Sequence, residues 1–321
     1  MNKFLTRRGK NVGYGSIALK KRNPLKDWQL YLFLLLPVIY IIIFKYIPMG
    51  GLVVAFKDYK VRKGIWGSDW VGFDQFIRFF ESYMFKDVIK NTLLLSVYSL
   101  LVSFPIPVIF ALTMNSIRNK YFKKVTQTIV NMPHFISTVV LVGIMLMVFH
   151  NRQGVYGNMM HFLTGKYPAD LFASPQAFRH FYVWSEVWQN FGWNSIIFTA
   201  ALAGVDPAYH EAAELDGATR LQRIFHVDLP TIVPTIVTML ILKMGHIFSL
   251  GFEKIFLMQN SLNLSASQVI STYVYEMGIS GSGAGNFSYA TAIGMFNNVI
   301  QLILVIIVNK ISRKVSETSL W

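Results

Sequence analysis

Long apolar stretches constrain this 321-residue chain more than any other feature. A helix needs about 20 mostly apolar residues to cross a bilayer. Six stretches approach or exceed that length, at residues 28–48, 87–114, 125–149, 181–203, 231–256 and 288–308. Only 14% of the residues are charged, whereas a soluble domain carries about 25%. The sequence therefore predicts an all-α membrane protein with six transmembrane helices.

The first apolar stretch predicts an anchor that is kept in the protein. It begins at Trp28 and ends near Lys45, Tyr46 and Pro48. A signal peptide has a shorter apolar core, followed by a small-residue cleavage site, and this stretch shows neither. We therefore expect a tail over residues 1–27, a membrane domain over 28–309 and a second tail over 310–321.

The distribution of basic residues predicts the orientation. Loops on the cytoplasmic side of a membrane protein carry an excess of Lys and Arg. The two tails and the segments 114–124 and 204–230 share one side and hold seventeen basic residues, against nine on the other side. Both termini are thus expected in the cytoplasm.

The net charge of +14 follows from this bias, with anionic lipid as the expected partner. Nucleic acid is not needed to explain the charge. The chain has no cysteine, and its seven histidines stand singly, so neither a disulfide nor a zinc site is expected.

A polar segment over residues 204–230 separates the fourth and fifth apolar stretches. Asp206 is a typical N-cap residue, and Pro207 stands at the first helical position, where proline is favoured. Good helix formers follow up to Leu215, and Gly217 is typical of a helix end. The pattern predicts a short helix on the cytoplasmic side.

The composition of this short helix indicates contact with another protein. Its small residues allow a partner surface to approach closely; they are Ala212, Ala213, Gly217 and Ala218. Glu211, Glu214 and Asp216 place charges at the rim, where charges steer association more than they add affinity. The alternative interpretation is a solvated connecting helix.

Nine residues of this segment match the EAA motif of ABC importer permeases, which reads E-A-A-x-x-D-G-A and, several residues later, an apolar residue, any residue and L-P. The matching residues are Glu211, Ala212, Ala213, Asp216, Gly217, Ala218, Val227, Leu229 and Pro230. The chain therefore resembles these permeases, although Val227 stands where isoleucine is commoner. The resemblance implies a type I ABC importer permease fold in which this segment is the coupling helix, seated in a groove of a nucleotide-binding subunit.

The wider resemblance is to carbohydrate permeases of the maltose-uptake superfamily. Residues 44–51, 55–59 and 67–72 are similar to the polysaccharide-type subgroup, which imports oligosaccharides. This implies a permease domain over residues 28–309 in a bacterial inner (cytoplasmic) membrane. The implied partners are a second permease, more often a different chain, two ATPase subunits and an extracellular solute-binding protein. The topology places residues 49–86 and 150–180 where that binding protein would dock, and no binding domain is fused to the chain.

ATP hydrolysis is not expected on this chain. The phosphate-binding pattern G-x-x-x-x-G-K-[ST] is absent. The glycine-rich run at residues 278–285 lacks the lysine, and its turn-forming composition predicts an extracellular loop. The chain is thus expected to have no catalytic residues and no cofactor of its own, with ATP and magnesium on the partner ATPase.

Ionisable and polar residues within the apolar stretches predict a substrate path. Ionisable groups at membrane depth are costly and usually face a cavity or the bundle interior. In the fifth stretch, Lys243, His246 and Glu253 fall on one face of a helix. If Lys243 lines the path, a uronate or other acidic sugar is favoured. A structural ion pair is the alternative for Lys243, and an interfacial position the alternative for Glu253 and Lys254.

Sugars are bound by hydrogen bonds to their hydroxyl groups and by stacking on aromatic rings. The fourth and sixth stretches offer residues of both kinds, namely Trp184, Glu186, Trp188, Gln189, Asn190, Trp193, Asn297, Asn298 and Gln301. Of these, we expect Trp184, Trp188, Trp193, Asn190, Asn298 and Gln301 on the path. The alternatives are interfacial anchoring for the tryptophans and hydrogen bonds between helices for the amides.

Two other classes of membrane protein fit the sequence less well than an importer permease does. An ion-coupled secondary transporter of a polar solute often carries central carboxylates and inverted repeats, and neither is evident here. A membrane enzyme would need a nucleophile with its base, or a metal site, and no such constellation is visible.

Overall fold

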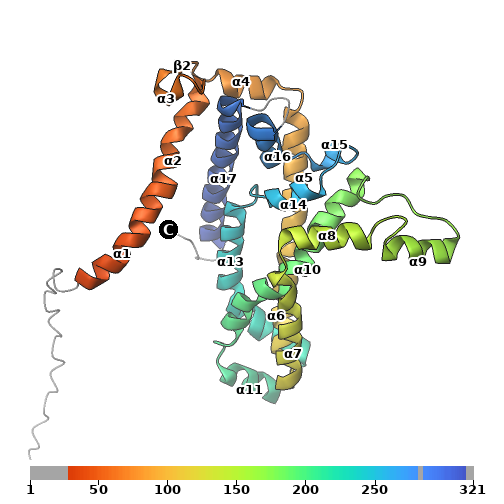
Figure 1. The fold of residues 1–321 in the computed structure, drawn as a ribbon. Helices are drawn as coiled ribbons and strands as arrows, with labels where there is room; N and C mark the ends of the chain where they lie inside the picture. The colour runs from red at the N-terminus through yellow and green to blue at the C-terminus, as the bar shows by residue number, and fades with distance from the viewer. Residues whose placement is uncertain (1–27, 281–284, 316–321) are drawn as a thin grey trace, which may run out of the picture. The chain divides into compact units, whose positions relative to one another are not determined.

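A computed structural model describes residues 28–280 and 285–315 (Figure 1). The predicted tail over 1–27, the last six residues of the second tail and residues 281–284 of the glycine-rich run lie outside this part. The chain divides into two compact units, residues 1–51 and residues 52–321. Each unit is described by itself.

The described residues of the first unit, 28–51, belong to one long helical run. It begins as α1 (Trp28–Ile41) and continues through η2 (Ile42–Tyr46) and α2 (Ile47–Met49) into η3 (Gly50–Phe56). The run Trp28–Phe56 is long and apolar enough to cross a membrane. Its apolar side chains are exposed along α1, as expected for a helix with lipid as its solvent.

Three more helical runs in the described residues are long and apolar enough to cross a membrane. The first joins α5 (Phe85–Ser103) to α6 (Pro105–Asn115); Pro105 sits at the start of α6, where proline is tolerated. The second joins α12 (Arg220–Arg223), η5 (Ile224–Asp228) and α13 (Leu229–Gly245). The third is α17 (Phe287–Val315), which packs beside α13 and extends past the predicted end at residue 308 (Figure 1).

The predicted third span, residues 125–149, is not a continuous helix. α7 (Lys120–Asn131) and η4 (Met132–Phe135) are followed by α8 (Thr138–Val148), with a bend of 96° between them. Pro133 cannot donate a backbone hydrogen bond, which favours the break. Ser137 is extended, and its hydroxyl accepts from the Val140 N–H at 3.4 Å, so it starts a new helix. α9 (Val155–Thr164) follows.

The predicted fifth span, residues 231–256, is also divided. α13 ends at Gly245, and α14 (Phe252–Met258) begins after an irregular stretch that includes Gly251. The single helix face expected for Lys243, His246 and Glu253 was therefore wrong. Beyond α14, the segment that precedes the sixth predicted span contains α15 (Leu264–Ser267), α16 (Ile270–Tyr275) and η6 (Glu276–Ser280). Only η6 overlaps the loop predicted at residues 278–285.

The predicted fourth span lies in α10 (Pro175–Leu202), which starts six residues before the apolar stretch. Its 28 residues span about 42 Å. Because it carries several polar side chains, α10 is not among the helices that are apolar enough by composition to count as membrane spans. Six uniform apolar spans are thus not what the described residues show: four helices are apolar, one pair is broken, and α10 is long but partly polar.

Three apolar clusters hold the second unit together. One joins α8, α10 and α14 around Phe178; the next joins α6, α10 and α13 around Ile232; the third joins α4 (Asp74–Glu81), α5, α16 and α17 around Phe79. Because α10 contributes to two of them, it is the central element against which the broken helices pack.

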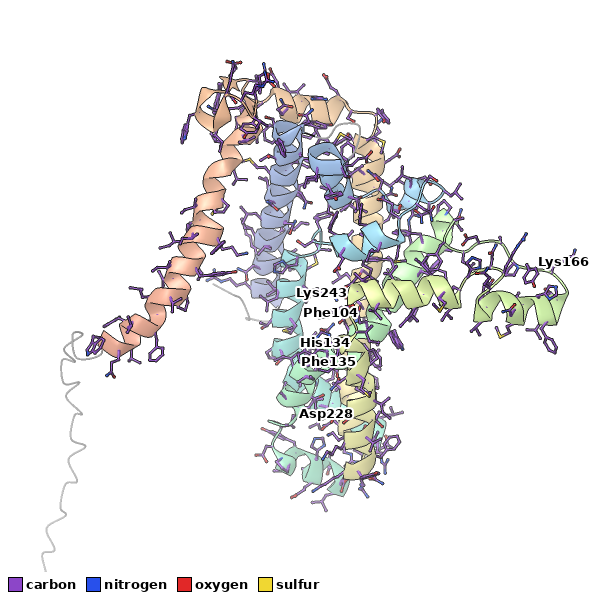
Figure 2. The ribbon with its side chains drawn as sticks, viewed as in Figure 1. Phe104, His134, Phe135, Lys166, Asp228 and Lys243 are labelled. Carbon is purple, nitrogen blue, oxygen red and sulfur yellow. The ribbon has the colours of Figure 1, made fainter. Side chains whose placement is uncertain are left out.

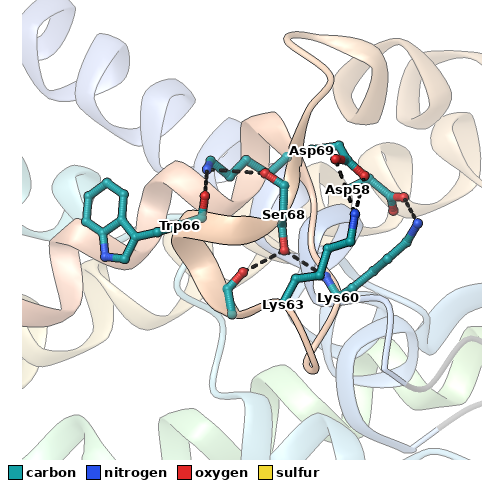
Figure 3. A network of polar contacts seen from close by, with 8 residues as sticks. Asp58, Lys60, Lys63, Trp66, Ser68 and Asp69 are labelled. Atoms are coloured by element: carbon teal, nitrogen blue, oxygen red, sulfur yellow. Dashed lines mark hydrogen bonds and ion pairs between the residues drawn. The ribbon is translucent and has the colours of Figure 1, made fainter.

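A small hairpin and a short helix mark opposite ends of the second unit (Figure 1). β1 (Lys57–Asp58) pairs antiparallel with β2 (Asp69–Trp70) around α3 (Gly64–Gly67). Lys57 Nζ donates to the Ile65 carbonyl at 2.9 Å. It also reaches the Trp66 carbonyl at 3.5 Å and the Ser68 carbonyl at 3.4 Å, and Ser68 Oγ donates to the Gly64 carbonyl at 2.6 Å (Figure 3). These bonds hold the hairpin together. It lies near α4, whereas α11 (Pro207–Leu215) lies at the far end of the unit (Figure 1).

Candidate functional site

The first candidate site is the short helix α11, which forms as the sequence predicts. The Asp206 carboxylate accepts from the Ala208 N–H at 2.9 Å, and Pro207 takes the first helical position. At the other end Gly217 adopts φ 77°, so that the Ala218 N–H reaches the Ala213 carbonyl at 2.9 Å. This left-handed position favours glycine and closes the helix.

The EAA residues lie largely on the surface. Glu211, Ala212, Asp216 and Gly217 are exposed, Ala213 and Ala218 are half-buried, and Leu229 and Pro230 begin α13. Leu215 is 90% exposed at the end of α11, an unusual position for leucine, and was not singled out from the sequence. An exposed leucine beside small residues is suited to a partner surface.

Glu214 points back into its own chain. It pairs with Arg118 at 3.3 Å and, more closely, with Arg223. The Arg223 guanidinium hydrogen-bonds Glu214 and holds the pKa of that carboxyl below its usual range. Glu211 makes no ion pair within the described residues. Of the charges predicted for the rim, Glu214 therefore anchors the segment, and Glu211 is available to a partner.

Asp228 is a second anchor for α11. Its side chain is buried, with 2% of the residue exposed, at the junction of η5 and α13 (Figure 2). Its Oδ1 lies 3.2 Å from His210 Nε2 on α11 and accepts from Asn115 Nδ2, at the end of α6, at 3.1 Å. The three residues line a cavity of about 370 Å³. One buried carboxylate thus ties α11 to two membrane helices.

The second candidate site is a cavity of about 590 Å³ in the second unit. Its wall comes from α5, from the break between η4 and α8, from α10, and from the connection between α13 and α14. The polar lining residues are Ser96, Ser99, Ser103, His134, Ser137, Thr138, Tyr182, Glu186, Gln189, Asn190, Lys243, His246, Ser249, Glu253 and Lys254. Both helix breaks therefore open onto this cavity and supply polar groups to it.

Four of the predicted path residues line this cavity: Asn190, Lys243, His246 and Glu253. Lys243 Nζ donates to the buried Ser103 Oγ at 2.6 Å (Figure 2). Glu253 reaches the same cavity from α14, although it does not share a helix with Lys243. Contact with substrate remains a prediction for all four.

The other predicted residues lie elsewhere. Trp184 and Trp188 line an apolar pocket against α8, and the Trp184 indole donates to Tyr98 Oη at 3.1 Å. Trp193 stacks on His134, with 4.4 Å between ring centroids. Asn298 lies in a groove along α16 and α17, and Gln301 accepts from Ser249 Oγ at 3.0 Å. None of these five lines the 590 Å³ cavity.

A chain of polar contacts runs along the cavity wall. Asn190 Oδ1 lies 2.8 Å from His134 Nδ1, and Asn190 Nδ2 donates to Glu186 Oε1 at 2.8 Å. Glu186 Oε2 then lies 3.5 Å from Lys254 Nζ. His134 was not among the residues predicted for the path, and an interfacial position was an alternative for Lys254. The spacing of Tyr182, Glu186 and Asn190 at every fourth residue was a signal for a polar face on α10.

The comparisons with known proteins agree with this architecture. A family described as "Binding-protein-dependent transport system inner membrane component" matches residues 103–317. The chain is 42% identical to Protein LplB of Bacillus subtilis (strain 168) over 98% of this chain and 95% of that protein. It is 39% identical to the polygalacturonan/rhamnogalacturonan transport system permease protein YteP of the same organism, over 91% of this chain and 90% of that one.

A solved structure is similar over nearly the whole chain. It is a crystal structure of a bacterial ABC transporter involved in the import of the acidic polysaccharide alginate, with a TM-score of 0.83, 40% identity, and coverage of 91% of this chain and 97% of that chain. A second structure shows a bacterial alginate ABC transporter in complex with an alginate pentasaccharide-bound periplasmic protein, at the same TM-score and identity. With several apolar helices and these matches, this multi-pass membrane protein is a transport permease that belongs to the binding-protein-dependent transport system inner membrane component family.

Proposed function

We propose that this chain is the permease subunit of an ATP-driven importer of oligosaccharides, acidic ones included. The observation that carries the proposal is the polar cavity, in which two lysines, two carboxylates and several hydroxyl groups converge between helices. Such a lining can exchange hydrogen bonds with sugar hydroxyl groups and can attract a carboxylate. YteP and the alginate transporters, with names that specify acidic polysaccharides, support this substrate class.

The coupling to ATP follows from how α11 is held. A partner ATPase that seats Leu215 and the exposed EAA residues would pull on α11 as its subunits close. Because Asp228 and Glu214 fasten α11 to α6 and to the α12–η5 segment, that pull would reach the helices around the cavity. The chain itself is proposed to bind no ATP, and magnesium and ATP would reside on the partner.

The opposite end of the second unit is proposed to meet the extracellular binding protein. The hairpin and the turn after α4 present exposed aromatic side chains there, with Trp66 89% and Tyr83 88% exposed. Tyrosine and tryptophan are enriched at protein interfaces. A periplasmic protein is bound in the complex of the alginate transporter. The remaining proposed partner is a second permease subunit in the bacterial inner membrane, and we propose that it is a different chain.

Co-purification with the ATPase tests the proposal. Glu211→Lys and Gly217→Trp are expected to abolish a stable complex, because one reverses the free rim charge and the other fills a left-handed turn with a large side chain. Lys124→Gln, at an exposed position on α7, is the matched control and should leave the complex intact. Uptake driven by an ion gradient with no ATPase present would overturn the proposal.

A further inference from the structure

Lys254 is a buried ammonium group with a weak partner. Only 3% of the residue is exposed, and its Nζ makes no hydrogen bond within the described residues. The nearest carboxylate oxygen, Glu186 Oε2, is 3.5 Å away, whereas a charge-assisted N–H···O bond is about 2.7–2.9 Å long. Nζ also lies 5.3 Å from the centroid of the Tyr182 ring. A buried charge with unused donors is costly unless a further group satisfies them.

Lys243 shares both the cavity and the carboxylate. Its ammonium group donates one hydrogen bond to Ser103 Oγ. No carboxylate lies within ion-pair distance of it in the described part of the chain. Glu186 interacts electrostatically with both ammonium groups. Its other oxygen, Oε1, also accepts from Asn190 Nδ2, so one carboxylate is shared between an amide and two ammonium groups.

The charges along the inner wall are therefore unequal. Two lysines and two carboxylates line the cavity, but only one carboxylate, Glu186, lies beside a buried lysine. Glu253 is exposed to solvent and makes no ion pair within the described residues, so the buried part of the wall holds two lysines and one carboxylate. His134 and His246 also face the cavity, and protonation of either adds positive charge. One incoming carboxylate would balance the excess, whereas a neutral sugar would leave it.

We propose that Lys254, together with Lys243, binds the carboxylate of a uronate unit in the cavity, and that Glu186 is the resident counter-ion with which that carboxylate competes. The inference rests on the proposed function, because it assigns the cavity to substrate. It adds a residue that determines specificity: Lys254 selects the acidic sugar, and Glu186 sets how strongly.

Charge-selective labelling of the cavity tests this in the complete transporter. The chain has no cysteine, so Ser99→Cys places a single thiol of this chain in the cavity wall. The rates of reaction with an anionic and a cationic methanethiosulfonate reagent are compared, with the partner subunits also made free of cysteine. Lys254→Met should lower the anionic-to-cationic rate ratio about fivefold or more, and Lys254→Arg should preserve it.

Glu186→Gln keeps both lysines and should raise the same ratio. This opposite direction separates an electrostatic effect from misfolding, which would not increase attraction for an anion. Glu253→Gln is the matched control, because its exposed carboxylate is screened by solvent; it should change the ratio less than Glu186→Gln does.

Protection from labelling then identifies the ligand class. Trigalacturonate should slow labelling of the thiol in the otherwise unchanged transporter and in Lys254→Arg, but not in Lys254→Met. Maltotriose should protect no better in one variant than in another. A rate ratio that Lys254→Met leaves unchanged, or protection by trigalacturonate that does not depend on Lys254, would overturn the inference.

The labelling experiment can fail independently of the proposed function. If the ATPase co-purifies and a neutral oligosaccharide is imported while the cavity shows no preference for anions, the inference fails and the importer stands. If no ATPase associates, the proposed function fails, and the labelling ratio still reports whether the cavity attracts anions.

Discussion

At Gly192 the missing side chain sets how closely α10 approaches α7. A Cβ there would lie 2.5 Å from the Val130 carbonyl oxygen and 2.7 Å from Asn131 Oδ1. Backbone cannot move aside as a flexible side chain can, so Gly192→Ala should overpack the contact. We expect destabilisation of about 1–3 kcal/mol and a lower midpoint of thermal unfolding in detergent.

Gly143→Ala is the control for this substitution. Gly143 lies inside α8, and nothing would stand within 4 Å of a Cβ there. Alanine is about 0.8–1.0 kcal/mol better than glycine within a helix, so this variant should be neutral or more stable. Equal midpoints for the two variants would contradict the close approach at Gly192.

Lys243 carries a prediction of its own at the residue scale. Lys243→Met removes the charge and keeps the length of the side chain. Uptake of acidic oligosaccharides should fall at least about tenfold, which corresponds to about 1.4 kcal/mol of lost interaction, whereas uptake of neutral ones should change little. Transport assays with both substrate types would decide, and equal losses for the two would remove the argument for an acidic sugar.

Residues governed by local backbone rules were predictable, and residues placed by tertiary structure were not. Asp206, Pro207 and Gly217 act within a few residues of one another, so capping preferences were sufficient to find α11. Lys254 reaches the cavity only because the chain turns between α13 and α14. A straight helix would have carried it towards the membrane surface, the alternative position expected from the sequence.

The same reasoning explains the two broken helices at the scale of the element. An apolar stretch reports the solvent around a segment, not the direction of its backbone, so a pair of helices bent by 96° has the composition of a single span. Pro133 was the visible signal for one break, and Gly245 with Gly251 for the other. Prolines at 105 and 107 left α5 and α6 as one run, so proline alone does not predict a break.

The contacts that attach α11 to the membrane helices lead to a prediction about how these elements move together. Asp228→Asn preserves shape but removes the charge that faces His210 and accepts from Asn115. We expect α11 to move less tightly with α6 and α13, so sugar transported per ATP hydrolysed should fall several-fold while the ATPase still co-purifies. Paired measurements of uptake and hydrolysis in proteoliposomes would show this.

One control variant and one weaker variant accompany Asp228→Asn. Lys124→Gln changes an exposed charge on α7 and should leave the ratio of transport to hydrolysis unchanged. Asn115→Ala should give a smaller loss in the same direction, because the contact between Asp228 and His210 remains. An unchanged ratio in Asp228→Asn would show that this buried carboxylate only stabilises the fold.

At the scale of the second unit, the arrangement has a sidedness. The segment that resembles a coupling helix and the aromatic hairpin lie at opposite ends, with the cavity residues Lys243 and His134 between them (Figures 1 and 2). An importer needs this order, because the solute arrives at one face and the ATPase acts at the other. The bias of seventeen basic residues against nine predicts a cytoplasmic position for α11 independently of any resemblance.

Labelling in cells tests that sidedness, and the lack of cysteine in the chain makes it direct. Arg62→Cys, exposed in the hairpin, should react with a membrane-impermeant maleimide in intact cells, after removal of any outer membrane barrier. Lys124→Cys and Leu215→Cys should react only after the inner membrane is permeabilised. Leu215→Cys should also be shielded when the ATPase is co-expressed, whereas Lys124→Cys should not. Labelling of residue 215 in intact cells would reverse the orientation and, with it, the assignment of α11 as the ATPase contact.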